Sequence, residues 1–313
     1  MIESAVTNMF IPNFRSGSHT DRGYREFNED EHICIDDLSA QLGHLFGCPL
    51  QSAFYAVFDG HGDSNAAAAY IKEHAMNLFF EDVNLPQTSE INDAFLKELV
   101  SAHRRAFLLA DQALAGESSV SPYSGTTALT ALLLGRHLMV ANAGDCRAVL
   151  CQKGVALQMS QDHRPSYPPE YQRVEKVGGY IEYGYLNGDL AVTRALGDWY
   201  MKSPLGSSSP LIAEPEVEHI MLTEEDEFLI VACDGIWDAI SNEEAVNLVR
   251  RALMRHDNPQ ECAKELVNEA LRLNTTDNVT AIVLCFSPPR SREPTPRRPR
   301  SRRDWNRLRN FLD

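Results

Sequence analysis

Four aspartates stand at the ends of apolar segments in this chain of 313 residues. Asp59, Asp145 and Asp234 follow the runs AFYAVF, VANAG and FLIVAC, and Asp277 directly precedes NVTAIVLCF. Acids fixed to the ends of rigid strands can meet at one rim of a sheet, where their repulsion would be severe without cations. Carboxylates with no cluster of histidines or cysteines suit hard ions such as Mg²⁺ or Mn²⁺ and argue against zinc. The pattern predicts a divalent metal site.

Each of these acids alone has a simpler interpretation. Asp59 and Asp234 are both followed by glycine, and Asp-Gly is common in hairpin turns. We would interpret either position by itself as a turn. The repetition of the arrangement at four positions favours the metal site.

A polar segment near the N-terminus, RGYREFNEDEHICI, adds a cation and two more acids. Arg25 stands four and five residues before Glu29 and Asp30. An arginine stays charged and offers a planar fork for two phosphate oxygens, and the acid pair can hold metal-bound waters. By itself the segment would be a polar turn before a strand, with Arg25 on the surface.

The apolar segments that carry the four aspartates have the length and composition of buried strands. They cover residues 53–58, 138–142, 228–233 and 278–286 and are rich in Val, Ile, Phe and Tyr. Periodicity leaves open whether they form one parallel sheet or two packed antiparallel sheets.

Helical patterns lie between these strands. Apolar residues recur at helical spacing in residues 68–78 and 91–110. Ser241 with Glu244 predicts a capping box before a third helix, and Pro259 suits the first turn of a fourth. The sequence therefore predicts a domain that mixes α and β elements.

Residues 287–313 differ from the rest of the chain in composition. They hold nine arginines against three acids, and many prolines, although the whole chain has a formal net charge of −15. We expect a folded domain over residues 1–286 and a disordered basic tail over residues 287–313. The acidic domain is not expected to bind nucleic acid through its general field.

The tail has two further interpretations. It could be a nucleic-acid arm, but Trp305 is the only aromatic residue among the arginines, so a solvated extension is the better prediction. The arginines between residues 297 and 303 also resemble a nuclear-import signal. An importin or another acidic partner is therefore a candidate for this segment.

Cysteine content and the lack of long apolar runs bear on the compartment. The seven cysteines are an odd number with no Cys-X-X-Cys pair, which signals neither a disulfide framework nor a zinc site. No segment reaches the roughly eighteen apolar residues needed to cross a bilayer, and the N-terminus has no secretion signal. We expect a monomer with reduced thiols, without a membrane span, in the cytoplasm, the nucleus or both.

A series of motifs resembles the metal-dependent serine/threonine protein phosphatases of type 2C, closest to plant members. The resemblance covers roughly residues 15–286, and its motifs occur in the family's order: RGYREFNED, VFDGHG, SGTTA, ANAGDCRAVL, QDHRP, VTRALGD, LIAEPEV, ACDGIWD and DNVTAIV. It implies an α+β fold, a sandwich of two mainly antiparallel β-sheets flanked by helix pairs. It also implies hydrolysis of phosphoserine and phosphothreonine in phosphoprotein substrates, in plant signalling.

The resemblance assigns a role to each acid. Asp59 would bridge two metal ions, Gly60 would offer its backbone carbonyl, and Asp234 and Asp277 would complete one ion. Glu29 and Asp30 would hold waters on the other ion, while Asp145 and Asp238 match the ligands of a weaker third ion. The implied ions are Mg²⁺ or Mn²⁺.

Three positions depart from the family pattern. Asn28, Asp63 and Cys146 stand where a methionine, a glycine and a serine are usual. None of these changes removes a ligand, although Asp63 adds a negative charge near the rim.

Two catalytic roles follow from the same resemblance and its chemistry. A water shared by two divalent ions becomes a nucleophile at neutral pH, while Arg25 and the ions absorb the charge of the phosphoryl group. His61, directly after the Asp-Gly pair, is the candidate proton donor to the leaving oxygen. The alternative is an inactive phosphatase fold that serves as a binding module, but every expected acid is present.

Overall fold

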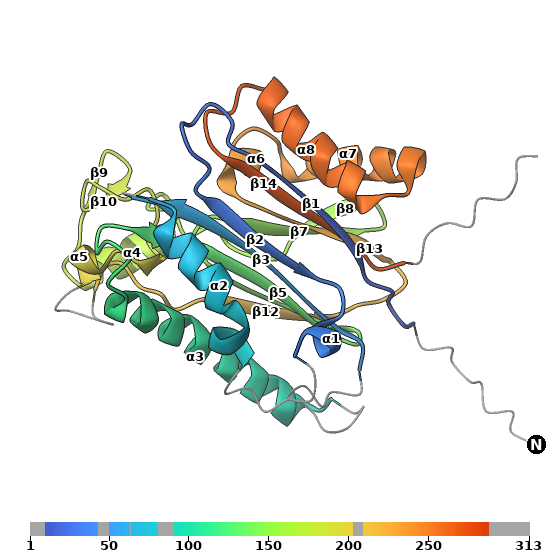
Figure 1. Cartoon of the computed structure of the whole chain (residues 1–313), viewed down its shortest axis with the longest axis horizontal. Helices are drawn as coiled ribbons and strands as arrows, with labels where there is room; N and C mark the ends of the chain where they lie inside the picture. The colour runs from blue at the N-terminus through green and yellow to red at the C-terminus, as the bar shows by residue number, and fades with distance from the viewer. Residues whose placement is uncertain (1–9, 43–49, 63, 81–90, 203–208, 288–313) are drawn as a thin grey trace, which may run out of the picture.

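Two β-sheets pack face to face between two pairs of helices (Figure 1). The computed structural model describes residues 10–42, 50–62, 64–80, 91–202 and 209–287. Asp63 and the basic tail from residue 288 onward lie outside the described residues. The predicted boundary of the folded domain and the predicted disorder of the tail therefore stay predictions.

The first sheet has five strands. Their order is β1 (Arg15–Asp21), β14 (Val279–Cys285), β13 (Asp226–Ala232), β7 (Arg147–Gln152) and β8 (Val155–Gln158). Two helices cover its outer face: α7 (Asn242–His256) and α8 (Pro259–Arg272).

The second sheet has seven strands. Their order is β11 (Leu196–Gly197), β4 (Gly125–Thr126), β3 (Ser52–His61), β5 (Ala128–Leu134), β6 (His137–Ala143) and β12 (Glu216–Met221), with β2 (Asp30–Ile35) paired to β3. Its outer face is covered by α2 (Ala66–Phe80) and α3 (Asp93–Gly116). All pairings between the strands of both sheets are antiparallel in the described part of the chain.

The remaining elements are short. They are α1 (Leu38–Leu42), α4 (Pro168–Lys176), α5 (Trp199–Lys202), α6 (Asp234–Trp237) and the hairpin of β9 (Ile181–Glu182) with β10 (Tyr185–Leu186). Within the described ranges, no helix has both the length and the apolar character that a membrane crossing requires.

Burial on both faces explains why the strands are continuously apolar. Successive side chains of a strand point to opposite faces. In β3, Ala53, Tyr55 and Val57 belong to the core between the sheets, whereas the alternate residues from Phe54 to Phe58 pack toward α2 and α3. The question that periodicity left open is settled in favour of two packed antiparallel sheets, so the expected α+β sandwich is confirmed.

The predicted helix starts are confirmed by their capping contacts. Ser241 accepts a hydrogen bond from the backbone of Glu244, whose carboxylate accepts in return from the Ser241 backbone, so α7 begins with a capping box. Pro259 occupies the first turn of α8 after the Asn258 cap. The α7–α8 pair packs on the sheet that carries β13 and β14 through a shared apolar core.

Candidate functional site

A pocket of about 560 Å³ lies where β3, β13 and β14 bring their acids together. Eight of the ten predicted site residues line it: Arg25, Glu29, Asp59, Gly60, His61, Asp145, Asp234 and Asp277. Asp234 follows β13 and Asp277 precedes β14 of the first sheet, and Asp59 lies in β3 of the second. Asp145 lies in the turn that joins β6 to β7. The two sheets therefore both contribute to the site.

Asp59 lies within β3 and not in a turn. The strand continues to His61, and Gly60 pairs with Thr126. Thr127 holds the backbone of Asp59 on both sides, because its amide donates to the Asp59 carbonyl at 2.9 Å and its hydroxyl accepts from the Asp59 amide at 3.2 Å. The hairpin-turn interpretation of this Asp-Gly pair is wrong.

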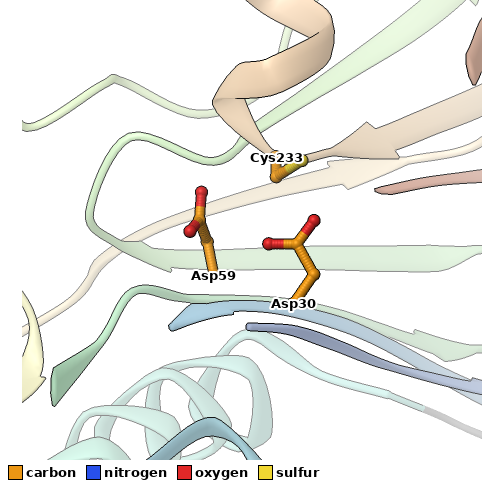
Figure 2. A group of neighbouring side chains, drawn as sticks. All are labelled: Asp30, Asp59 and Cys233. Atoms are coloured by element: carbon orange, nitrogen blue, oxygen red, sulfur yellow. The ribbon is translucent and has the colours of Figure 1, made fainter. Parts of the chain in front are cut away.

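Asp30 stands directly opposite Asp59 in the antiparallel ladder of β2 and β3. Figure 2 shows the two carboxyl groups side by side beneath Cys233. Asp30 is 5% exposed, and neither of its carboxylate oxygens has a hydrogen-bond partner among the described residues. Burial raises the pKa of Asp30 to about 6. Like charges placed opposite each other destabilise a sheet, so this pair requires compensation from another group.

Asp145 and Asp234 extend the cluster beyond Asp59. Carboxylate oxygens of all three lie within 4.8 Å of one another. Burial raises the pKa of Asp59 well above its usual value, and the neighbouring Asp30 and Asp234 raise it further. Burial and the charges of Asp145 and Asp277 raise the pKa of Asp234 to about 8. The cluster holds more negative charge than the protein itself neutralises.

Asp234 begins α6, and the glycine after it serves a close approach. A Cβ on Gly235 would lie 2.0 Å from the backbone carbonyl oxygen of Asn278. Asn278 in turn accepts a hydrogen bond from the Glu29 amide at 2.8 Å. The second Asp-Gly pair therefore lets three segments meet at the pocket and makes no hairpin.

The donor set favours hard cations. Cys233 also has its sulfur within 4.8 Å of ligand atoms of Asp30 and Asp59. Burial raises the pKa of the Cys233 thiol well above its usual value, with the two acids adding to the effect. A neutral thiol is a poor metal ligand, so the oxygens of the carboxylates dominate the cluster.

Arg25 reaches the pocket through an ion pair. Its Nη2 lies 2.8 Å from Oδ2 of Asp277, and its Nε donates to the Thr276 carbonyl at 3.3 Å. The Arg25 side chain is 51% exposed, so its outer nitrogens remain accessible from the pocket. Glu29 lies nearby with a pKa that burial raises.

His61 pairs with an acid that the sequence did not single out. Its Nε2 lies 2.7 Å from Oδ2 of Asp198, whose side chain is fully buried. Burial lowers the pKa of His61, but the charge and hydrogen bond of Asp198, together with the charges of Asp145 and Glu29, leave the pKa raised. A Cβ on Gly125 would lie 2.0 Å from the same carboxylate oxygen, so glycine is required there for the pair to form.

A buried ion pair supports the segment that carries Asp198. Lys202 Nζ lies 2.7 Å from Oδ1 of Asp111, and the same oxygen accepts from the Gly197 amide at 2.8 Å. Lys202 is 2% exposed. Asp111 on α3 thus fixes the backbone next to Asp198.

Arg164 is the second residue with a contact that the sequence did not reveal. Its guanidinium pairs with Asp145, Asp234 and Asp238. Asp238 lies at the end of α6, is 56% exposed and does not line the pocket. Two predicted residues therefore do not line the pocket. Asp30 is buried behind its wall, and Asp238 lies at its rim.

Both missed residues belong to motifs already noted, VTRALGD and QDHRP. Nothing in their spacing indicates which acid or base they contact, because the partners lie 137 positions away for His61 and Asp198 and up to 74 positions away for Arg164. Three tyrosines also line the pocket: Tyr123, Tyr185 and Tyr200.

Comparisons with known proteins agree with the geometry. Residues 14–279 match the family described as protein phosphatase 2C. The protein named "Probable protein phosphatase 2C 47" from Oryza sativa subsp. japonica is 61% identical over 277 residues, which cover 88% of this chain and 71% of the rice protein. "Probable protein phosphatase 2C 43" from Arabidopsis thaliana is 58% identical over 307 residues, which cover 96% and 71%.

Solved structures share the fold. The crystal structure of a serine-threonine phosphatase 2C from Toxoplasma gondii has a TM-score of 0.72 at 23% identity and covers 89% of this chain and 98% of that chain. A Caenorhabditis elegans sex determining protein has a TM-score of 0.73 at 24% identity and covers 88% and 66%. At these identities the likeness concerns the fold alone.

Proposed function

Because this chain belongs to the protein phosphatase 2C family, we propose that its acidic pocket hydrolyses phosphoserine and phosphothreonine in proteins with the help of divalent metal ions. The chain is a serine/threonine protein phosphatase of the plant type, and its substrates are phosphoproteins. The alternative of an inactive binding module is not favoured, since every acid expected of the site is present.

The observation that carries the proposal is the excess of buried negative charge. Asp30 has two buried oxygens without hydrogen-bond partners among the described residues, and it stands against Asp59. Isolated buried carboxylates are strongly unfavourable unless they are paired or bind metal. The residues therefore fit hard divalent ions, and we assign Mg²⁺ or Mn²⁺, two ions with a weaker third.

The acids divide by their position around the pocket. Asp59 would serve both ions, and Asp234, Asp277 and the Gly60 carbonyl would complete the ligands of one of them. Glu29 and Asp30 would act on the other through water. When bound, such ions would supply an activated water as the nucleophile at neutral pH.

The protein's own cations act on the phosphoryl group and the leaving oxygen. Arg25 would orient the phosphate with its planar fork, since it is held at the pocket by Asp277 while half of its side chain stays exposed. His61 would give its proton to the departing serine or threonine oxygen. The raised pKa of His61 supports this role, because it favours the protonated imidazole that a proton donor requires.

We also propose an oligomeric state, a location and partners for the enzyme. We propose that the chain acts as a monomer in the cytoplasm, the nucleus or both, within plant signalling. For the basic tail we propose an importin or another acidic partner, and no nucleic acid.

The experiment is a phosphothreonine-peptide assay with and without Mn²⁺ or Mg²⁺. We expect turnover only with added metal, loss in excess EDTA, and loss in Asp59→Asn. Glu218→Gln is the matched control, since it removes one exposed acid of β12 that does not line the pocket. Full turnover in EDTA would contradict the proposal.

A further inference from the structure

Arg164 occupies the space between three acids that the proposed metal site also uses. Its Nε lies 2.9 Å from Oδ2 of Asp145, and its Nη2 lies 3.1 Å from Oδ2 of Asp234. Its Nη1 lies 3.0 Å from Oδ1 of Asp238. One guanidinium therefore engages one or more oxygens of each acid at once.

These contacts are confined to the outer part of the cluster. Asp30 and Asp59 form no ion pair with Arg164, so the inner acids are left without a cation from this residue. Asp234 belongs to both parts, because its oxygens also lie near those of Asp59. The fixed positive charge thus covers the outer acids and not the inner ones.

A divalent ion and Arg164 cannot use the same oxygens together. An N–H group that donates to a carboxylate oxygen occupies the direction from which a metal would approach, and two cations at one site repel each other. An ion bound by Asp145 and Asp238 must therefore displace the guanidinium.

The displacement requires only a side-chain movement. The backbone beside Arg164 is anchored, because the His163 amide donates to the Gly144 carbonyl at 2.9 Å and Arg147 pairs with Asp162 at 2.5 Å. The Arg164 side chain itself is 31% exposed and can swing into solvent. The loop would stay in place while the guanidinium leaves.

We propose that Arg164 is a built-in cation that competes with the outermost divalent ion for Asp145, Asp234 and Asp238. The inference rests on the proposed metal-dependent function and adds a reason for the unequal strength of its ions. The inner ions share only Asp234 with Arg164, and Asp30 and Asp59 form no ion pair with it, whereas the outer ion binds only when Arg164 leaves. The opposite arrangement is a permanent clamp, in which Arg164 stays on the acids and supports the ions.

The test is calorimetric titration of the full chain with Mn²⁺, for the wild type, Arg164→Gln and Arg250→Gln. Arg250 is the matched control, since it pairs with Glu227 on the surface and does not line the pocket. We expect Arg164→Gln to tighten the weakest Mn²⁺ step by about tenfold, the scale of one charge-assisted hydrogen bond. The stronger steps and the control should change by less than about twofold.

The titration distinguishes failure of the proposed function from failure of the proposed competition. If the wild type binds no Mn²⁺, the proposed function fails. If the wild type binds Mn²⁺ and Arg164→Gln leaves every step unchanged, the competition is wrong although the function stands. Weaker binding in Arg164→Gln would establish the clamp.

A second variant covers the case in which Arg164→Gln does not fold by circular dichroism. Arg164→Lys keeps the charge but loses the planar fork that reaches three acids. We expect it to tighten the weakest step by a smaller factor than tenfold, with the other steps unchanged. An unchanged or weaker last step in Arg164→Lys would overturn the competition.

Discussion

Two groups of buried charges in this molecule differ in how they are compensated. In the pocket, Arg164 at the outer edge is the only described residue that forms an ion pair with the acid cluster of Asp30, Asp59, Asp145 and Asp234. Within α4, Glu170 is also buried but is bound by Arg173 and Arg194. The comparison separates charge that completes the fold from charge that requires an added ion.

The Glu170 group is satisfied by the protein itself. Its carboxylate accepts from Arg194 at 2.7 Å, from Arg173 at 2.8 Å and from the Thr193 hydroxyl at 2.7 Å. Burial alone would raise the pKa of Glu170, but hydrogen bonds from the two arginines outweigh it and lower the pKa to about 2. These hydrogen bonds stabilise the charged form of Glu170 and leave its carboxylate oxygens unavailable to a metal ion.

The acid cluster shows the opposite response. Burial raises the pKa of Asp234 to about 8, since the attraction of Arg164 does not offset the neighbouring acids. Burial therefore accompanies opposite pKa shifts in Glu170 and Asp234, because only Glu170 is compensated by its neighbours. The direction of the shift distinguishes a structural acid from one that awaits a cation.

The largest expected effect comes from Asp59→Asn. Activity on a phosphothreonine peptide should fall about a thousandfold or more, because several kcal/mol of transition-state stabilisation depend on the ions. The metal-free protein should at the same time become more stable, since one repelling charge is removed. Turnover in Mn²⁺ and urea unfolding in EDTA measure the two effects. Lower stability in EDTA would place Asp59 with the compensated acids.

Glu170→Gln should do the reverse. Removing one partner of a buried ion pair costs about 3–5 kcal/mol, because the remaining charges are left uncompensated. The free energy of unfolding from urea titration should fall by this amount with or without Mn²⁺. The control Glu218→Gln should change it by less than about 0.5 kcal/mol. A loss of unfolding free energy that appears only with metal would contradict the assignment of Glu170 as an acid that the protein itself compensates.

His61 sharpens the comparison, because it joins the pocket to a fully buried acid. His61→Gln should lower kcat for a phosphopeptide about a hundredfold, the scale of general acid catalysis. Para-nitrophenyl phosphate should suffer much less, since its leaving group needs little protonation. An equal loss on both substrates would remove the proton-donor role. Asp198→Asn should shift the alkaline limb of the phosphopeptide profile to lower pH, because Asp198 raises the pKa of His61.

The last expected effect is a pair of opposite pH dependences of stability. Without metal, folded Asp234 keeps its proton up to about pH 8, whereas the unfolded chain releases it near the usual value of 3.8. The folded state then binds more protons between these values, so stability falls as pH rises through that window. Asp234→Asn should flatten this slope in urea titrations in EDTA. A slope that survives the substitution would contradict the assignment.

Glu170 should act at the other end of the pH scale. Its pKa is lowered from 4.5 to about 2 on folding, so its contribution is present above pH 4.5 and is lost as pH falls toward 2. Glu170→Gln should remove this acid-side loss and leave the metal-dependent slope unchanged.

Much of the fold could be predicted from local sequence. The strands around Phe54 and Ile230, the capping box at Ser241 and the helix start at Pro259 all depend on neighbouring residues. The sheet topology could not, because continuous apolar runs are compatible with parallel and antiparallel pairing alike. The motif resemblance supplied that answer.

Four acids of the site could be predicted because each stands at the end of an apolar segment, but their partners could not. The pairing of Asp30 with Asp59 depends on the register of two strands, and the pairing of His61 with Asp198 depends on a residue with a φ of 53°. Lys202 would be expected on the surface, yet it is buried against Asp111. Such contacts arise from tertiary packing, which local spacing does not encode.

The position of Asp59 and His61 on one strand has a consequence for how the chain can vary. They are two residues apart on β3, and both line the pocket. In a pleated strand such residues project from the same face about 7 Å apart, a distance set by covalent geometry. One inserted residue between them would turn His61 to the opposite face, and no adjustment of a loop could restore it. Insertions beside Asp145 or Asp277 could be absorbed by the adjoining turns. The spacing within β3 is therefore the least variable part of the site.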